Sequence, residues 1–392
     1  MEELFKTIEG LNEEIIEIRR HLHKHPELSF EEVETPKFIA SFHEKLGHEV
    51  KTGVGGNGVV AYLKGSHDGP TVALRADFDA LPIQEETELD FKSVNDGVMH
   101  ACGHDGHTAT LLGVAKALNK HKDELHGTVV FIHQHAEELP PGGARPMIED
   151  GALEGVDVIF GTHLQAQMPL YEINYRTDAL QASSDSFEVT ILGRGGHGAY
   201  PQDTKDSILI ASQLVSNLQQ IVSRRVNPLQ SAVLSVCSFE AIGPYNVIAN
   251  TAKIKGTVRT LNEETRALME EEMLRVIEGT CHLSGADFEF NYERGYPVLI
   301  NHEDETNFLV DVAKTVPEVK EINETEPIMG GEDYSYYLQE VKGTYFFTGA
   351  QVEGSEEPYP HHHPKFDIDE RALGVAAKIL AKTTVEYMNK NK

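Results

Sequence analysis

Eight consecutive residues carry an unusual density of side chains that can bind a metal ion. They read His100-Ala-Cys102-Gly-His104-Asp105-Gly-His107, and so supply one thiol, three imidazoles and one carboxylate. Soft sulfur, borderline nitrogen and hard oxygen together are the ligand types of transition-metal sites. The same residues could instead form a Cys/His/Asp nucleophile site or a polar loop over the core. The segment therefore favours a metal site but leaves the other two interpretations open.

Three predicted strands bring further polar side chains to their carboxyl ends. The strands cover 71–76, 129–134 and 156–161, and the second is a continuous apolar run typical of a sheet buried on both faces. The side chains that follow them are, in order, Asp77 and Asp79, Glu137 and Glu138, and His163. Open α/β sheets place their sites at the carboxyl ends of strands, so these residues can converge on one rim. Each also has a plain structural alternative, as a turn, a solvated loop or a core histidine.

Composition narrows the classes of function. The 392 residues are too many for one ordinary core, so we expect two domains. Lys and Arg number 34 against 63 Asp and Glu, and the net charge of -29 disfavours binding to nucleic acid or to an anionic membrane surface. The three cysteines are sparse, and there is neither an apolar signal segment nor a run of about 18 apolar residues. These features predict a cytoplasmic protein.

The pattern of predicted elements changes in the middle of the chain. Between residues 183 and 292 the order is β-α-β-β-α-β, the split βαβ arrangement of a ferredoxin-like domain. An α/β pattern precedes and follows this segment. We therefore predict a first domain made of residues 1–182 and 293–392, interrupted by an inserted domain at 183–292. The glycine-rich turn at 193–201 carries His197 and does not match a phosphate-binding loop.

The motifs taken together resemble a known family. Matching blocks are, along the chain, RRHLHKHPELSFEE from Arg19, RADFDALP, MHACGHDGHT, AEELPPGGA, FGTH, GRGGHGAYP, NVIANTAKIKGTVRT, GGEDYSYY and HHPKFDID. Their number and order resemble the dizinc amidohydrolases and exopeptidases of clan MH, in peptidase family M-twenty, subfamily D. That family includes aminoacylase, hippurate hydrolase and the auxin-conjugate hydrolases. The resemblance covers nearly the whole chain.

The resemblance implies an α/β fold with two parts. One is a zinc-exopeptidase-like catalytic domain with a mainly parallel central sheet, and the other is an inserted α+β ferredoxin-like lid and dimerisation domain. Two divalent metal ions (Zn, Mn, Co or Ni) are implied for each subunit. Their implied ligands are Cys102, which bridges both ions, and His104, Glu138, His163 and His362. Because His361 and His363 flank the last ligand, the register of that histidine stays open.

The same resemblance implies roles for other residues. Glu137 matches the general base, and His197 matches a histidine that reaches the oxyanion from a partner subunit. A homodimer through the inserted domain is therefore implied. Candidates for binding the substrate are Asn246, Arg259, Gly331 and Glu332. Asp79 and Asp105 are candidates for orienting the ligand imidazoles from outside the metal shell.

The chemistry expected of this set is the hydrolysis of an amide bond. Two divalent ions about 3.5–4 Å apart can hold a bridging hydroxide and lower its pKa to about 7. Glu137 can then pass the proton to the leaving nitrogen. We therefore expect a metal-dependent amidohydrolase that acts on N-acyl amino acids or small peptides. The alternatives are a broader peptidase (carboxypeptidase, dipeptidase or endopeptidase) on the same site, a thiol hydrolase that uses Cys102, and a non-catalytic binding protein.

Overall fold

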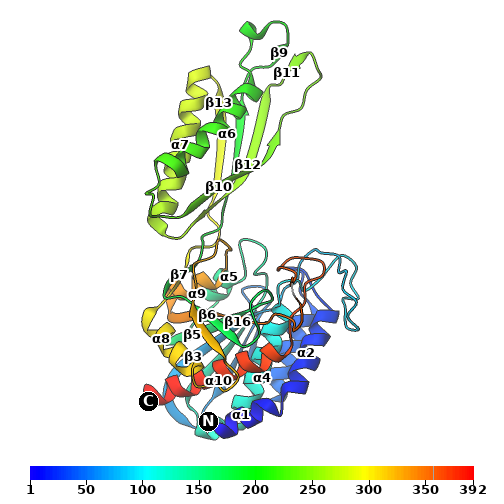
Figure 1. Ribbon diagram of the computed structural model, residues 1–392, viewed down its shortest axis with the longest axis vertical. Helices are drawn as coiled ribbons and strands as arrows, with labels where there is room; N and C mark the ends of the chain where they lie inside the picture. Colours follow the sequence, from blue (N-terminus) through cyan, green and yellow to red (C-terminus); the bar gives the residue numbers. More distant parts are fainter. Residues whose placement is uncertain (356) are drawn as a thin grey trace. The chain divides into compact units, whose positions relative to one another are not determined.

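Both ends of the chain build one unit, and a middle segment builds another. The computed structural model describes residues 1–355 and 357–392. The first unit comprises Met1–Leu180, Ile300–Glu326 and Asp333–Lys392, and the second comprises Gln181–Leu299 and Pro327–Glu332 (Figure 1). The sequence places the inserted domain at 183–292, whereas the second unit extends to Leu299 and takes in a short return at 327–332.

A mixed sheet forms the centre of the first unit. Its strands are β1 (Glu49–Val54), β2 (Gly58–Lys64), β3 (His67–Asp77), β4 (His126–Gln134), β5 (Val158–Gln165), β6 (Glu172–Tyr175), β15 (Glu321–Glu324) and β16 (Lys342–Gly349). Within the described residues the strand order is β1-β2-β4-β3-β5-β16-β6-β15. The central strands β4, β3, β5 and β16 run parallel, whereas β1–β2, β2–β4 and β16–β6 are antiparallel pairs. The expected parallel sheet is thus confirmed at its centre.

Helices from both ends of the chain cover this sheet. They are α1 (Glu2–Glu9), α2 (Asn12–Lys24), α3 (Glu34–Lys45), α4 (His104–Lys120), α5 (Ala144–Glu149), α8 (Glu303–Ala313), α9 (Tyr334–Glu340) and α10 (Arg371–Lys390), with a short 3-10 turn at Lys122–Glu124. Helices α4 and α10 pack against each other and on β3, and α1 and α2 contact both of them (Figure 1). Nearly every residue of α4 is buried, which is typical of a helix inside the core.

The first helical segment differs from its prediction. The apolar spacing predicts one amphipathic helix over 2–25, but the structure has two helices, α1 and α2, with a break at Gly10 and Leu11. Glycine is a poor helix former, so the helix ends there at little cost. The predicted apolar stripe is nevertheless buried as a whole, because the break keeps its residues on one side. These residues are Leu4, Ile8, Leu11, Ile15 and Ile18.

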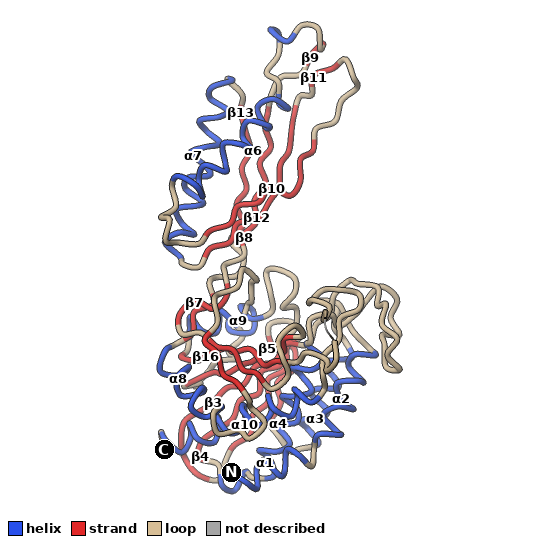
Figure 2. The backbone as a smooth tube through the Cα atoms, in the orientation of Figure 1, coloured by secondary structure: helices blue, strands red, loops and turns tan. Residues whose placement is uncertain are grey.

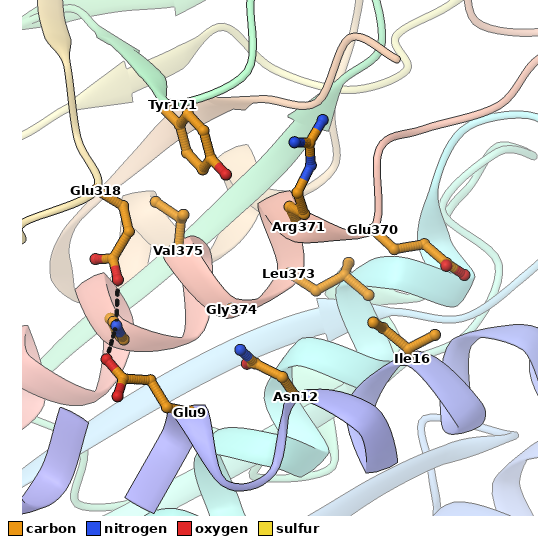
Figure 3. A pocket seen from close by; sticks show the side chains of 11 residues that line it. Glu9, Asn12, Ile16, Tyr171, Glu318, Glu370, Arg371, Leu373, Gly374 and Val375 are labelled. Carbon is orange, nitrogen blue, oxygen red and sulfur yellow. Dashed lines mark hydrogen bonds and ion pairs between the residues drawn. The ribbon is translucent and has the colours of Figure 1, made fainter. Parts of the chain in front are cut away.

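Polar side chains join the two ends of the chain around a small cavity. The Lys378 side chain of α10 is 3% exposed; its Nζ donates to Glu9 Oε1 at 2.7 Å and also contacts Glu318 (Figure 3). With Asn12, these residues line a cavity of about 240 Å³. A buried lysine paired with two carboxylates thus fixes the carboxyl-terminal helix against α1 and closes the first unit.

The second unit has the element order that the sequence predicts. Its main elements are β8 (Asp185–Leu192), α6 (Ser207–Arg224), β10 (Ala232–Glu240), β12 (Thr251–Thr260), α7 (Glu263–Ser284) and β13 (Asp287–Glu293). The strands form a sheet in the order β10-β12-β8-β13 with antiparallel pairing, and both helices pack on it (Figure 2). This is the split βαβ arrangement of a ferredoxin-like fold.

Short elements complete the second unit and the chain segments next to it. The pair β9 (Gly196–His197) and β11 (Val247–Ile248) is antiparallel, a 3-10 turn covers Pro201–Asp203, and β7 (Asp178–Gln181) pairs with β14 (Leu299–Asn301). None of the described helices has both the length and the apolar character that crossing a membrane requires.

Candidate metal centre

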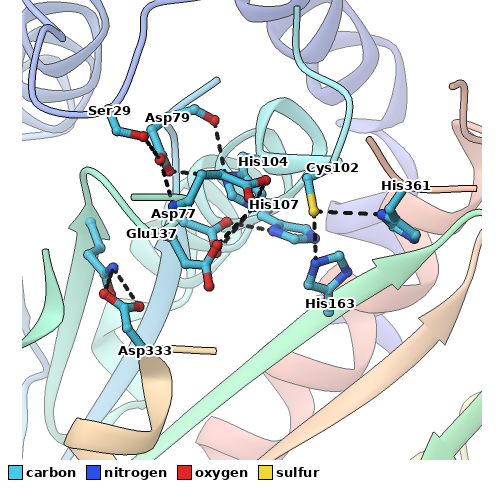
Figure 4. A network of polar contacts seen from close by, with 12 residues as sticks. Ser29, Asp77, Asp79, Cys102, His104, His107, Glu137, His163, Asp333 and His361 are labelled. Carbon is cyan, nitrogen blue, oxygen red and sulfur yellow. Dashed lines mark hydrogen bonds and ion pairs between the residues drawn. The ribbon is translucent and has the colours of Figure 1, made fainter. Parts of the chain in front are cut away.

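Neighbouring parallel strands end side by side and deliver the side chains of the site. Strand β3 lies between β4 and β5, and Asp77 at its end pairs in register with Gln134 at the end of β4. His163 lies inside β5 rather than after it, because this strand runs further than the sequence predicts. Figure 4 shows Asp77, Glu137 and His163 gathered around Cys102. The convergence expected from the strand ends is therefore present in the first unit.

The amino-terminal end of α4 completes this rim. The sequence predicts the helix from residue 108, but it begins at His104. Gly103 precedes it with a φ of 97°, a left-handed conformation that glycine adopts without steric cost. His104 and His107 therefore lie three residues apart in the first turn, where their side chains share one side of the helix. Both are buried.

Hydrogen bonds fix which ring nitrogen of His104 and of His163 can bind a metal ion. His104 Nδ1 lies 3.0 Å from the Asp79 carbonyl oxygen and 3.1 Å from Asp79 Oδ1, so it carries the proton and donates. His163 Nδ1 donates to the Leu164 carbonyl oxygen at 2.9 Å. In both rings the Nε2 lone pair is therefore directed into the site, which is the arrangement of a ligand oriented by a neighbouring acceptor.

One group of donor atoms joins Cys102, His104 and Glu138. Each contributes one atom, and these atoms all lie within 4.8 Å of one another. His104 Nε2 is 3.8 Å from Glu138 Oε1, and both atoms are buried without a hydrogen-bond partner. Buried polar atoms in native proteins are nearly always paired, so two unpaired atoms that face each other fit a cation that binds between them in place of a proton.

Cys102 also faces donors on its other side. Its Sγ is 3.5 Å from His163 Nε2, and His362 Nε2 is 3.3 Å from Glu138 Oε2. Two ligands of one tetrahedral ion, each about 2.0–2.3 Å from it, stand about 3.3–3.7 Å apart. Both pairs match this separation. The single thiol thus borders His104 and Glu138 on one side and His163 on the other, so the residues present offer donors that fit divalent metal ions.

The sequence cannot decide whether His361 or His362 is the predicted ligand. Its Nδ1 is 3.7 Å from Cys102 Sγ, and its Nε2 accepts from the Ala166 N–H at 3.3 Å. A neutral ring that accepts at Nε2 carries its proton on Nδ1. His361 therefore donates towards the sulfur, whereas His362 Nε2 faces Glu138 Oε2.

One of the two candidate aspartates supports predicted ligands, and the other does not act as expected. Asp79 accepts from His104 and also from the Glu138 N–H at 3.0 Å, so it orients two of the predicted ligands. Asp105 was the other candidate for orienting a ligand imidazole. Instead it bonds to Arg19 and His23, each at 2.9 Å, and so secures the first turn of α4.

His107 and Asp77 form a separate support. His107 Nδ1 donates to Asp77 Oδ1 at 2.6 Å, and its Nε2 accepts from the Leu164 N–H at 2.9 Å. Both nitrogens are thus occupied, which leaves His107 no lone pair for a metal ion. Asp77 Oδ2 takes a further hydrogen bond from Arg75 Nη1 at 2.6 Å. This buried chain fixes α4 to the ends of β3 and β5.

The surroundings of the thiol are strongly acidic. Burial raises the pKa of Cys102 well above its ordinary value, and the carboxylates of Glu138, Glu137 and Asp77 raise it further. Burial lowers the pKa of His104, but the nearby carboxylates of Asp77, Asp79 and Glu138 outweigh this effect and raise the pKa to about 10. Buried like charges are costly unless a cation compensates them. Divalent cations would remove this cost and ionise the thiol.

Comparison with known proteins identifies the family. A model of Peptidase family M20/M25/M40 matches residues 73–386. The chain belongs to this family. Among its relatives, the Bacillus subtilis protein YhaA, which carries the name of an amidohydrolase, is 57% identical over 385 residues, or 98% of this chain and 97% of YhaA. N-acetylcysteine deacetylase of Bacillus subtilis is 43% identical over 378 residues, or 95% of this chain and 96% of the relative.

A solved structure extends this comparison to the metal. The crystal structure of Bacillus subtilis YXEP, a dinuclear metal-binding peptidase, aligns with a TM-score of 0.84 at 39% identity and covers 97% of this chain and 99% of that one. Membership of Peptidase family M20/M25/M40 confirms that the chain is a hydrolase acting on amide bonds, as the sequence predicts. The two-part α/β fold is confirmed as well.

The second unit of this family member holds the remaining predicted residues in two places. His197 and Asn246 are exposed at the β9–β11 pair, where the Gly198 N–H donates to the Asn246 carbonyl oxygen at 2.8 Å. Arg259 lies in β12 and is half-buried. Gly331 lies so close to its guanidinium that a Cβ at position 331 would be 3.2 Å from Arg259 Nη1. Glu332 is buried.

Several residues of the site were not predicted from the sequence. They are Arg19, His23, Glu32, Arg75 and Asp333, all of them buried charged or polar side chains. Arg75 Nη2, for example, donates to Asp333 Oδ1 at 2.9 Å. The sequence did contain a signal for Arg19 and His23. Both continue the apolar stripe of the first helical segment at helical spacing, so they lie on the buried face of the helix, where an exposed lysine or glutamate would be out of place.

Proposed function

We propose that this enzyme releases an amino acid from N-acyl amino acids or small peptides, using two divalent metal ions bound in the first unit. The proposed ligands are Cys102, His104, Glu138, His163 and His362. The observation that supports this most is the pair of orphaned atoms, His104 Nε2 and Glu138 Oε1, beside a thiol shared with a second set of donors. Zn, Mn, Co and Ni all suit such a mixed set.

The protein's own groups account for the movement of protons. Divalent ions held by these ligands would supply Lewis acidity, which would polarise the amide carbonyl and lower the pKa of a water to about 7. Glu137 is buried, and its Oε2 is 4.0 Å from His104 Nε2, which sets its carboxylate beside the proposed ligands. It accepts the proton of the water and transfers it to the leaving nitrogen. The two carboxylate oxygens of Glu138 face His104 Nε2 and His362 Nε2, which supports Glu138 as the ligand and leaves Glu137 as the base.

The second unit supplies the proposed contacts to substrate. Arg259, with Gly331 beside it, offers a planar guanidinium that can grip the substrate carboxylate with two hydrogen bonds. His197 is proposed to stabilise the oxyanion from a partner subunit, with Asn246 next to it as a further hydrogen-bonding group. Glu332 is proposed to contact the substrate as well. A homodimer through the second unit follows from this assignment.

Metal removal and substrate choice test the proposal together. Purified enzyme is treated with a chelator, dialysed, and assayed after adding Zn, Mn, Co or Ni, with N-acetyl amino acids and dipeptides as substrates. We expect chelation to abolish turnover, one or more of these ions to restore it, and N-acyl amino acids to be cleaved fastest. Turnover that survives exhaustive chelation would overturn the metal assignment. Faster cleavage of peptides would instead favour a carboxypeptidase or dipeptidase on the same site.

A subunit-mixing experiment tests the dimer. His197→Ala and Glu137→Gln each inactivate the chain in this scheme. If His197 acts across the interface, a heterodimer of the two variants contains one site with both residues intact. Mixing should therefore restore up to about one quarter of wild-type activity, whereas action within one subunit restores none.

The thiol hydrolase is the weaker candidate. A nucleophilic cysteine needs a depressed pKa, whereas burial and three carboxylates raise the pKa of Cys102.

All three cysteines have free thiols, and a thiolate ligand must stay reduced, so we propose a reducing compartment such as the cytoplasm.

A further inference from the structure

The turn that presents the two glutamates has a strained backbone. Ala136, directly before Glu137 and Glu138, has a φ of 50°, in the left-handed region that residues with a Cβ rarely adopt. It is completely buried, and its carbonyl oxygen accepts from the Gly143 N–H at 3.1 Å. Such a conformation is unfavourable and persists only where surrounding contacts enforce it.

Glu32 makes the contact that enforces this turn. Its Oε1 accepts from the Ala136 N–H at 2.9 Å, and its Oε2 accepts from Asn57 Nδ2, also at 2.9 Å. Glu32 is only 2% exposed, and burial raises its pKa to about 7. An N–H buried without an acceptor is unfavourable, so the carboxylate that accepts from it selects this backbone conformation.

The loop that carries Glu32 touches the centre at two more points. We call residues 27–35 the brace. Ser29 Oγ donates to Asp79 Oδ2 at 2.6 Å, and the same oxygen accepts from the Glu138 N–H (Figure 4). The Phe30 ring packs edge-on against the His135 ring, with 5.8 Å between the ring centroids. The brace thus contacts both the residue that orients His104 and the turn that carries the glutamates.

Hydrogen bonds of Glu27 tie down the brace at its two ends. The carboxylate of Glu27 accepts from the backbone N–H groups of Val33, Glu34 and Thr35 at 2.8–3.0 Å, which closes the loop at the start of α3. Glu27 also contributes its carbonyl oxygen to the Ala80 N–H at 2.8 Å. A loop fixed at both ends can hold a group in place without paying for its own ordering when substrate binds.

We propose that Glu32 is a positioning residue: by holding the Ala136 N–H, it aims Glu137 at the reacting water and Glu138 at the metal ions. This rests on the proposed function, in which Glu137 is the base and Glu138 a ligand. Glu32 itself touches neither ion nor substrate. Its effect is geometric, and a displacement of about 1 Å at a reacting group can cost about 10²-fold in rate.

Two conservative variants of Glu32 distinguish the effect of side-chain length from the effect of charge. Glu32→Gln loses the charge but keeps an oxygen that can accept from the Ala136 N–H, while the Asn57 amide can turn over to accept from the new amide. Glu32→Asp keeps the charge but is one methylene too short. Glu31→Gln and Glu31→Asp, at the exposed neighbouring position, are the matched controls. Each protein is assayed for kcat and KM with saturating metal, and for metal affinity by competition with a chelator.

We expect Glu32→Asp to lower kcat about 10–100-fold and to weaken metal binding by a similar factor, with KM changed less than about twofold. Glu32→Gln should stay within about threefold of wild type in each quantity, like both controls. The reverse order, with Asp near wild type and Gln impaired, would show that charge matters and would overturn the proposal. So would variants that lose thermal stability while their folded fraction keeps wild-type kcat and metal affinity. Metal affinity is read without turnover, so a wild-type enzyme that proves inactive on amides would contradict the proposed function and leave this measurement intact.

Discussion

Arg19 Nε lies 2.9 Å from Asp105 Oδ2, and both side chains are almost completely excluded from solvent. The guanidinium also reaches Asp367 Oδ1 at 3.0 Å and Glu370 Oε1 at 3.2 Å. Asp105 follows the proposed ligand His104, and the two other acids follow the histidine loop 361–363. One buried arginine of α2 therefore joins two segments of the proposed metal centre that are far apart in the sequence.

Loss of this arginine should destabilise the fold severely. Arg19→Met leaves Asp105 buried with only His23 as a partner, and breaking a buried ion pair from one side costs about 3–5 kcal/mol. We expect the free energy of unfolding, measured with urea on metal-free protein, to fall by this amount. Arg20→Met is the matched control, because Arg20 also binds Glu370 but its side chain is 49% exposed. It should cost less than about 1 kcal/mol, and equal losses in the two variants would contradict the role of burial.

The two adjacent glutamates should fail in different ways. Glu137→Gln removes the proposed base but no ligand, so kcat should fall about 10²–10⁴-fold while metal content stays at wild-type level. Glu138→Gln removes a proposed ligand, so it should lower metal content directly. Elemental analysis of dialysed protein, beside steady-state kinetics, distinguishes the two. Metal loss in Glu137→Gln with retention in Glu138→Gln would mean that the assignments are exchanged.

A chain of buried histidines predicts how stability changes with pH. His43 Nδ1 is 2.9 Å from His48 Nδ1, and His43 Nε2 is 3.0 Å from His133 Nε2. Burial, with repulsion from His133 and His48, lowers the pKa of His43 to about 2, and burial lowers that of His133 to about 3. Both rings are therefore neutral in the folded state above these values, whereas in the unfolded chain they protonate below about pH 6.5.

The sign follows from the protons bound in each state. Below pH 6.5 the unfolded chain binds protons that the folded chain does not. The free energy of unfolding therefore decreases as the pH is lowered, by up to about 1.4 kcal/mol per pH unit for each ring. His43→Gln should reduce this slope by one such increment between pH 6 and 4, measured by urea unfolding. His25→Gln, at an exposed position, should leave the slope unchanged. An unchanged slope in His43→Gln would show that the ring is charged in the folded state.

Local patterns carried most of the predictions that the structure and the family confirm. Apolar runs located the central strands, the change to β-α-β-β-α-β marked the second unit, and the quoted motifs led to the family. Where local prediction failed, a backbone feature with little sequence signal was responsible. The start of α4 at His104 depends on the left-handed Gly103, and the extension of β5 through His163 depends on pairing with β16 as far as Gln165.

Contacts between distant segments account for what the sequence could not supply. The positions of Arg19 and Asp367, which bond to each other, differ by 348 in the sequence, and no local pattern reports such a pair. The roles of similar histidines are equally hidden. His104 and His107 have the same side chain and the same helix turn, yet only the second receives the Leu164 N–H on Nε2 and so has no lone pair for an ion.

The same reasoning separates His361 from His362. The Ala166 N–H directs the proton of His361 to Nδ1, towards Cys102, whereas His362 Nε2 faces Glu138. We therefore expect His362→Ala to lose about one of two bound ions and almost all activity. His361→Ala should keep both ions, and activity should fall about 10–100-fold because the hydrogen bond to the sulfur is gone. Elemental analysis and spectra of the cobalt-substituted enzyme, whose thiolate band reports on Cys102, measure both effects. Loss of an ion from His361→Ala, with full occupancy in His362→Ala, would move the ligand assignment by one residue.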